Sequence, residues 1–162
     1  MKPETVQDAG VRLSPTRQEE SEELVSVRIQ AMRESLERIG RFDPERARQR
    51  FLARFVPEFT RHILLASERV GFVAVRPATD QLHLEHLYVR SEYQGRGAGS
   101  AVLGILFEEA DSRALPLRVG ALRGSDANRF YLRHGFIRVE EGEWDIYYVR
   151  APVARNGVPD RG

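Results

Sequence analysis

Three glycines at alternate positions, Gly95, Gly97 and Gly99, stand between a strand-like run and an apolar-periodic helix. The strand-like run covers residues 82–89, and residues 97–110 place apolar side chains along one helical face. The first four N–H groups of a helix have no partner within it, and the helix dipole adds about half a positive charge there. Because glycine lets the backbone approach a ligand without Cβ obstruction, this junction predicts a diphosphate site built from main-chain amides.

Two other interpretations of the glycine junction compete with a diphosphate site. A dinucleotide-binding fold needs Gly-x-Gly-x-x-Gly, but the third position falls on Ser100 when counted from Gly95 and on Val102 when counted from Gly97. The dinucleotide interpretation is therefore excluded. A tight strand-to-helix turn that binds nothing would use the same glycines, and this alternative stays open. Arg96 favours the anion site, because its charge would assist the amides.

Periodicity along the rest of the chain predicts a mixed α/β fold. The predicted strands cover residues 11–13, 62–67, 70–75, 82–89, 117–121, 136–139 and 146–149. The predicted helices cover residues 25–39, the segment between Asp43 and Pro57, and residues 97–110 and 126–134. Arg69 and residues 77–80 are expected to supply the turns between the middle strands. Three consecutive strands before a crossover helix imply a mixed rather than an all-parallel sheet.

The length of 162 residues fits one ordinary domain, which we expect to cover residues 11–150. Residues 1–10 and 151–162 are polar or rich in Pro and Gly, and we expect them to be flexible ends. The formal net charge of +1 gives no overall field that would attract nucleic acid. The longest apolar run, residues 101–107, is far shorter than the ~20 residues of a membrane helix. With a polar start to the chain, these features predict a cytoplasmic protein without a nucleic-acid or membrane partner.

Missing residue types exclude several kinds of chemistry. The chain has no Cys, which excludes thiolate-bound zinc, iron–sulfur clusters and a cysteine nucleophile. Lys2 is the only lysine, so no interior lysine is available for a Walker-type phosphate loop. His83 and His86 stand an odd number of residues apart on one strand, so they face opposite sides and cannot chelate one metal ion. We therefore expect no metal site.

The junction contains Gln94-x-x-Gly97-x-Gly99, which resembles the acyl-CoA signature of the GNAT superfamily of N-acetyltransferases. Residues 82–89 resemble the fourth strand of that family, and residues 127–136 resemble its later helix with the Phe-Tyr-x-x-x-Gly-Phe ending. The resemblance extends over nearly the whole predicted domain. It implies an α/β fold with a mixed, mostly antiparallel central sheet of about seven strands and about four flanking helices, splayed between strands 4 and 5.

The resemblance also implies acetyl-CoA as a cosubstrate. Its pyrophosphate would be held by the signature and the backbone amides within it, at Gln94, Gly95, Arg96, Gly97, Ala98, Gly99 and Ser100. Its pantetheine arm would pair with the strand main chain at Leu87, Tyr88 and Val89. The family often carries an Asn three residues before the Ala of the later helix. That position here is Gly124, and Asn128 is a candidate substitute for it at the coenzyme.

Acetyl transfer to an amine needs a base for the amine and an acid for the departing thiolate. The chain has neither Cys nor a Gly-x-Ser-x-Gly elbow, so we expect direct attack by the amine. Glu85 is the candidate base, because it shares a side of its strand with Leu87, and His83 on that side is a second candidate. Tyr131 matches the family's acid and would also contact the coenzyme. The same sequence is also expected if Glu85 is an ordinary solvated glutamate and Tyr131 an ordinary core tyrosine.

The expected acceptor is a primary amine of a small molecule or peptide. Four acidic residues surround Trp144 and would suit a cationic amine, although a solvated hairpin turn would carry the same residues, Glu140, Glu141, Glu143 and Asp145. Two other functions fit the motifs: a non-catalytic CoA-binding or regulatory domain of the same fold, and an interaction domain whose glycine turn is empty. The family resemblance also suggests a homodimer.

Overall fold

The computed structural model describes residues 10–154, which contain seven strands and four α-helices. The strands are β1 (Val11–Pro15), β2 (Thr60–Leu65), β3 (Glu68–Pro77), β4 (Leu82–Val89), β5 (Leu117–Leu122), β6 (Ile137–Glu141) and β7 (Asp145–Arg150). The helices are α1 (Ser21–Arg38), α2 (Pro44–Arg54), α3 (Ala98–Ser112) and α4 (Ala127–Arg133). Short 3-10 turns lie at Gln18–Glu20, Pro57–Phe59 and Ser91–Tyr93.

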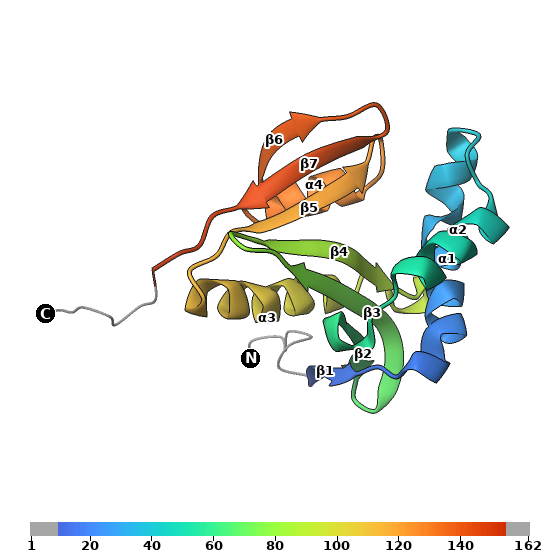
Figure 1. Cartoon of the computed structure of the whole chain (residues 1–162), viewed down its shortest axis with the longest axis horizontal. Coiled ribbons are helices and arrows are strands. Elements are labelled where there is room, and N and C mark those ends of the chain that lie inside the picture. The colour runs from blue at the N-terminus through green and yellow to red at the C-terminus, as the bar shows by residue number, and fades with distance from the viewer. Residues whose placement is uncertain (1–9, 155–162) are drawn as a thin grey trace, which may run out of the picture. The chain divides into compact units, whose positions relative to one another are not determined.

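The strands form a seven-stranded sheet in the order β1-β2-β3-β4-β5-β7-β6 (Figure 1). β4 and β5 pair in parallel, with Leu82 opposite Leu117 and Leu84 opposite Val119. The pairs β1–β2, β2–β3, β5–β7 and β6–β7 are antiparallel. This mixed sheet with four helices confirms the predicted fold class.

The chain divides into two compact units. The first unit holds the described chain up to Val75 together with His86–Val102, and the second holds Arg76–Glu85 and the described chain from Leu103 onward. The boundary falls inside β3, β4 and α3, so each unit contains part of these elements. The glycine turn belongs to the first unit, whereas Glu85, Asn128 and Tyr131 belong to the second.

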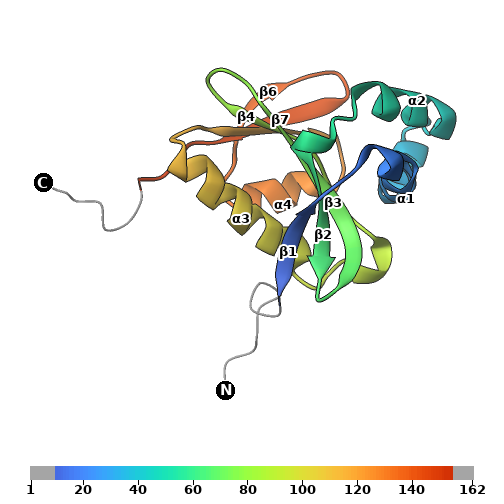
Figure 2. The same cartoon turned by 60° about the horizontal axis from the view of Figure 1, so that its bottom comes forward.

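In the first unit, α1 and α2 pack against β3. Phe51 and Phe72 are both buried, and their rings meet edge to face with centroids 5.7 Å apart. They share one apolar cluster with three buried residues of α1, which are Leu24, Val25 and Val27. In Figure 2, α1 and α2 lie together beside the strands of this unit. Burial of these side chains is what fixes the two helices on the sheet.

The helix boundaries in the first unit follow the predicted signals. Asp43 caps α2 by accepting the N–H of Arg46 at 3.1 Å, and Pro44 occupies the first turn. The turn expected at Arg69 is wrong, because Arg69 lies inside β3. The chain reverses before it, at Ala66, whose φ of +57° gives a left-handed turn that no glycine signals.

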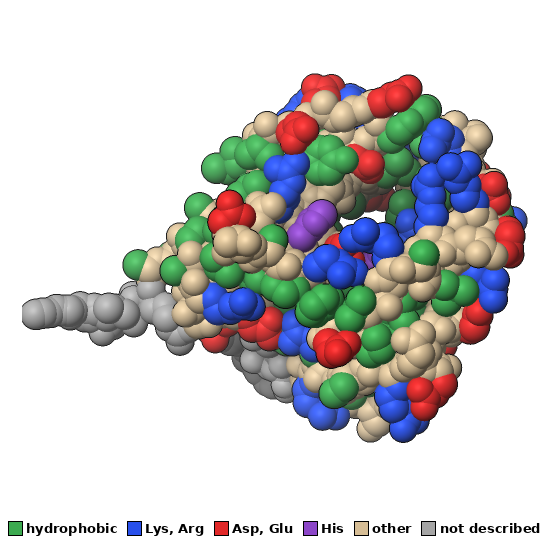
Figure 3. Space-filling model, viewed as in Figure 1, with side chains coloured by type: hydrophobic (Ala, Val, Ile, Leu, Met, Phe, Trp, Pro, Cys, Tyr) green, Lys and Arg blue, Asp and Glu red, His purple; other side chains and the backbone are tan. Residues whose placement is uncertain are grey.

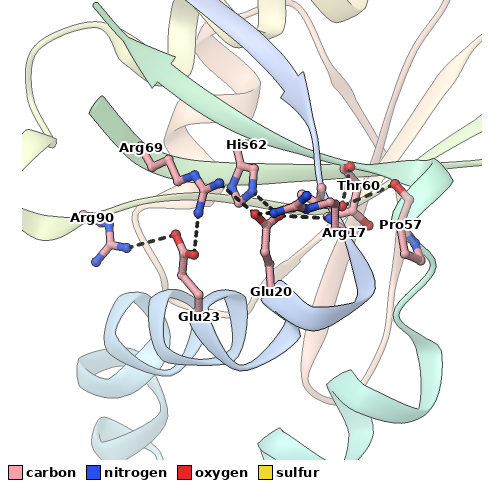
Figure 4. A network of polar contacts seen from close by, with 9 residues as sticks. Arg17, Glu20, Glu23, Pro57, Thr60, His62, Arg69 and Arg90 are labelled. Atoms are coloured by element: carbon pink, nitrogen blue, oxygen red, sulfur yellow. Dashed lines mark hydrogen bonds and ion pairs between the residues drawn. The ribbon is translucent and has the colours of Figure 1, made fainter. Parts of the chain in front are cut away.

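A polar network ties the start of α1 to β2, β3 and the end of β4 (Figure 4). Glu20 accepts a bond from Arg69 at 2.7 Å and lies 2.8 Å from Nε2 of the buried His62. Arg69 also donates to Glu23 at 2.7 Å, and the Arg90 guanidinium lies 3.8 Å from Glu23. The hydrogen bond to His62 is the largest cause that lowers the pKa of Glu20 to about 2, against the opposing effect of burial. The network thereby anchors the residue that follows β4 and precedes the glycine turn.

In the second unit, the sheet has one apolar face and one polar face. The buried side chains alternate along β5 and β7 and comprise Leu117, Val119, Ala121, Ile146 and Tyr148. α4 lies against β5 and carries the buried Tyr131 (Figure 1). Successive side chains of a strand point to opposite sides, so Arg118 and Tyr147 lie on the other face.

Charged side chains of both signs are interspersed on the face drawn in Figure 3, in keeping with the formal net charge of +1. In the ion pairs of the described residues, the cationic partner is an arginine, except in the pair of His62 with Glu20. Between residues 10 and 154, none of the helices combines the length and the apolar character needed to cross a membrane.

Candidate active site

The glycine turn lies in the first unit, between β4 and α3. Gly95 and Gly97 have φ angles of +77° and +87°, in the left-handed region that favours glycine. A Cβ at Gly95 would have no heavy atom within 4 Å, so the turn is open there. The first helical bond of α3 runs from the Ala101 N–H to the Gly97 carbonyl at 3.0 Å. The amides of Ala98 and Gly99 therefore precede the first helical hydrogen bond, which is the arrangement an anion site requires.

Two side chains of the glycine turn have definite positions. Gln94 donates from Nε2 to the Val89 carbonyl at 2.8 Å and so closes the turn back onto the end of β4. The Arg96 guanidinium lies 5.5 Å from the centroid of the Tyr93 ring. Arg96 and Ser100 are exposed, so their side chains lie at the surface of the turn. The signature glutamine thus shapes the turn, and Arg96 adds a positive charge to it.

The main chain of β4 near the turn has an edge that faces away from β3. Arg90 donates its N–H to a β3 carbonyl at 2.7 Å, and the Tyr88 carbonyl approaches Gly71 so closely that a Cβ there would clash with it. Neighbouring residues of a strand present their backbone groups to opposite edges. Leu87 and Val89 therefore direct theirs away from β3, as pairing with a pantetheine arm would require.

The side chain of Tyr88 lies in the core of the first unit rather than in the turn. Its ring meets Phe72 edge to face at 5.6 Å and packs against the cluster formed with Phe51. Only its main chain is then available to a coenzyme on this strand.

Glu85, the candidate base, is held by an arginine of the neighbouring strand. Its carboxylate accepts a hydrogen bond from Arg76 Nε at 2.8 Å, and its side chain is 12% exposed. Charge-assisted bonds of this kind are short and directional, so Arg76 both stabilises the carboxylate and limits its rotation. His83, the second candidate, lies two residues earlier on β4 and pairs in register with Arg118 of β5.

Tyr131, the candidate acid, is 6% exposed and lies among aromatic rings. Its ring meets Phe130 at 5.3 Å and Phe136 at 5.2 Å, both nearly edge to face, and lies 6.4 Å from Tyr148. These contacts fix the ring plane on α4. The structure thus gives Tyr131 a rigid setting within the second unit, and its role as an acid stays a prediction.

Asn128 bridges β5, α4 and β7 within the second unit. Its amide donates to the Leu122 and Ser125 carbonyls, both at 2.9 Å, and its carbonyl accepts from the Tyr148 hydroxyl at 2.7 Å. Gly124, where the family often has Asn, adopts a φ of +84°. Protein groups thus occupy both donor hydrogens and the carbonyl of Asn128, so its place at the coenzyme stays a prediction.

Two acidic residues of the β6–β7 hairpin are paired with arginines. Glu140 accepts from Arg118 at 2.7 Å, and Glu141 accepts from Arg123 at 2.7 Å and also from Arg138. The bond from Arg123, followed by that from Arg138, lowers the pKa of Glu141. Since these carboxylates are already neutralised, they add little to the case for a cationic acceptor.

Sequence reasoning did not identify Arg76 as the partner of Glu85. Opposite charges on either side of the turn between β3 and β4 are a signal that could have found it. It also missed Tyr147, whose ring lies against Gly120 of the facing strand. A glycine inside a strand is a signal for such a close approach.

The chain thus combines a mixed sheet, with a parallel β4–β5 pair, and an open glycine turn between β4 and α3 whose amides suit an anion. The family model described as an acetyltransferase (GNAT) domain matches residues 60–138. This match confirms the resemblance to the GNAT superfamily that the motifs indicate. Among curated proteins, none matches the chain in sequence.

Solved structures share this fold at low sequence identity. The PaiA N-acetyltransferase from Thermoplasma acidophilum, in complex with coenzyme A, has a TM-score of 0.72 and 15% identity, covering 88% of this chain and 99% of its own. An acetyltransferase from Thermus thermophilus has a TM-score of 0.68 and 22% identity, covering 87% and 96%. The ribosomal-protein-S18-alanine N-acetyltransferase from Escherichia coli has a TM-score of 0.68 and 15% identity, covering 93% and 100%.

Proposed function

We propose that the protein transfers an acetyl group from acetyl-CoA to a primary amine of a small molecule or peptide. The observation that carries the proposal is the glycine turn, which is exposed, left-handed at Gly95 and Gly97, and placed at the start of α3. The turn fits a diphosphate, because its amides precede the helical hydrogen bonds and a Cβ at Gly95 would meet open space. The GNAT family model over residues 60–138 adds support.

The coenzyme would be held mainly by main chain of the first unit. Amides from Gly95 to Ser100 would bind the pyrophosphate, with the Arg96 guanidinium adding charge. The outward backbone of Leu87 and the outward N–H of Val89 would hydrogen-bond the pantetheine arm, since the Val89 carbonyl already accepts a bond from Gln94. Bound acetyl-CoA would supply the acyl carbon and a thiol leaving group.

The chemistry would be carried by side chains of the second unit. Glu85, aligned by Arg76, would take the proton from the attacking amine, directly or through a water. The amine nitrogen forms a bond to the acyl carbon as the C–S bond breaks. Tyr131 would give its hydroxyl proton to the departing sulfur, leaving an N-acetyl amine and the free thiol.

Two measurements on the purified chain test this function. In a thermal scan, acetyl-CoA at about 100 times its dissociation constant should stabilise the folded state by about 2.7 kcal/mol. With a panel of amines, polyamines and peptides, at least one acceptor should release free thiol above the acceptor-free rate.

The two results separate the proposal from its rivals. Absence of any stabilisation by acetyl-CoA would contradict it and favour an interaction domain. Stabilisation without thiol release on any acceptor would favour a non-catalytic CoA-binding domain.

A further inference from the structure

One arginine of the second unit lies on the same face of the sheet as the candidate base. Arg118 of β5 pairs in register with His83 of β4, and Glu85 lies two residues further along β4. Paired residues, and residues two apart on a strand, share a face. Glu85 directly follows the last register pair, Leu84 with Val119, and therefore stands on the same face as Arg118, where both side chains border the same part of the sheet.

The Arg118 guanidinium is fixed by its neighbours before any ligand binds. It lies over the Tyr147 ring, with 4.9 Å between its central carbon and the ring centroid. The Tyr147 ring in turn lies so close to Gly120 that a Cβ there would come within 2.9 Å of Cε1. An arginine held in this way loses little conformational entropy on binding, and its planar fork matches a carboxylate.

The present partner of Arg118 is a carboxylate that a ligand can replace. Glu140 accepts from Arg118 Nη2 at 2.7 Å, but its side chain is 61% exposed whereas that of Arg118 is 24% exposed. Glu140 stands on β6, the last strand of the sheet, all of whose residues are exposed. Ion pairs with such an exposed member contribute little to stability, so exchange of one carboxylate for another costs little.

We propose that Arg118 binds a carboxylate of the acceptor, so that the acceptor is an amine with a carboxylate close to the reacting nitrogen, as in an amino acid. This inference rests on the proposed acetyl transfer. The acceptor nitrogen then faces Glu85 while its carboxylate takes the place of Glu140 on the Arg118 guanidinium. The Tyr147 ring keeps that guanidinium in place.

The test compares L-amino acids with their amides as acceptors, by free thiol release. Removal of the carboxylate leaves an amine that is more readily deprotonated near neutral pH, so chemistry alone would favour the amides. We expect the opposite, with kcat/KM at least about tenfold higher for the best acid than for its amide, because a charge-assisted pair is lost with the carboxylate. The α-amides of aspartate and glutamate retain only the side-chain carboxylate. They therefore show whether a carboxylate at the side-chain position is recognised as well as one beside the amine.

Three variants assign the preference to Arg118. Arg118→Gln should raise KM for the acids about tenfold or more and leave the amides unchanged. Glu140→Gln should lower KM for the acids, because it removes the competing carboxylate. This surface change also keeps the test available if Arg118→Gln does not fold. Arg138→Gln, which removes another arginine paired with a β6 glutamate, should leave both acceptor classes unchanged.

Several outcomes would overturn the inference while leaving the proposed function standing. One is an equal kcat/KM for the acids and their amides, and another is an equal effect of Arg118→Gln on the KM of both classes. A third is that a chain that binds acetyl-CoA and acetylates other amines acetylates no amino acid. Failure of the proposed function is distinguishable, because then either acetyl-CoA gives no thermal stabilisation or no acceptor of the whole panel, acid, amide or other amine, releases thiol.

Discussion

The glycine turn of the first unit and the Glu85–Tyr131 region of the second are built from different kinds of polar group. The turn offers main-chain amides, an open surface at Gly95 and backbone angles that favour glycine. Glu85 and Tyr131 are side chains, mostly buried, with Glu85 bonded to Arg76 at 2.8 Å. The first region depends on local backbone geometry, and the second depends on side-chain contacts, such as the bond from β3 to β4 that holds Glu85. Substitutions should therefore separate coenzyme binding from chemistry.

The largest effect is expected in the turn. Gly97→Val should weaken acetyl-CoA binding at least about 100-fold, because a branched residue at a φ of +87° is strained and its side chain would meet the phosphates. Isothermal titration with acetyl-CoA measures this. A thermal scan without coenzyme checks folding. Gly40→Val is the matched control, because Gly40 is also a left-handed glycine but lies far from the glycine turn in sequence, and this variant should keep its affinity for acetyl-CoA. Unchanged affinity in a folded Gly97→Val protein would contradict a main-chain coenzyme site.

The next effect is expected at Glu85. Glu85→Gln should lower kcat about 100-fold at neutral pH, because the amine must lose its proton without a positioned base. The deficit should shrink as the pH rises, since more of the amine is then already deprotonated. A pH–rate profile on the best acceptor of the panel measures both, and the affinity for acetyl-CoA should not change. A uniform loss at every pH would point to a structural role for Glu85.

A smaller effect is expected at Tyr131. Tyr131→Phe should lower kcat by about 10- to 100-fold, less than Glu85→Gln. The reason is that a thiol has a pKa of about 8.5, so its thiolate is a fair leaving group even without an acid. The ring contacts with Phe130 and Phe136 are retained, so the melting temperature should change little. Single-turnover thiol release measures the step. A normal rate would leave Tyr131 as a core residue only.

The smallest effect on activity is expected from the polar network around Glu20 (Figure 4), whose contribution is to the stability of the fold. The pKa of Glu20 is lowered from 4.5 to about 2, chiefly by the bond to His62, so the folded state favours its carboxylate form. Its contribution to stability, on the order of 1 to 3 kcal/mol, is present above about pH 4.5 and is lost as the pH falls toward 2. Urea unfolding of the wild type and Glu20→Gln across that range measures it. Parallel pH curves for the two proteins would contradict this account.

The same contrast explains how much could be predicted from the sequence. Left-handed glycines and capped helices are local, so the sequence predicts the open turn at Gly95 and Gly97 and the start of α2 after Asp43. The bond from Arg76 to Glu85 depends on how β3 and β4 align across their turn; the opposite charges there are a signal for the pair, but they do not specify the register of the two strands. The turn at Ala66 was missed because alanine carries no signal for a left-handed backbone.

The side-chain environment of the second unit was the least predictable part. Asn128, whose place at the coenzyme stays a prediction, joins Leu122, Ser125 and Tyr148 through its side-chain amide, which no motif indicated. Such a bridge requires three elements to meet, and their meeting is a result of tertiary packing rather than of any motif.

The reliance on arginine in the ion pairs has a practical consequence if the protein uses the proposed acetyl-CoA, a reactive thioester. A guanidinium stays protonated and is a poor nucleophile, whereas a lysine amine would slowly capture acyl groups by itself. With Lys2 as its only lysine, the chain has almost no amine of its own to acylate. Self-modification should therefore add little background to thiol assays, and amine-directed labels should attach at very few positions.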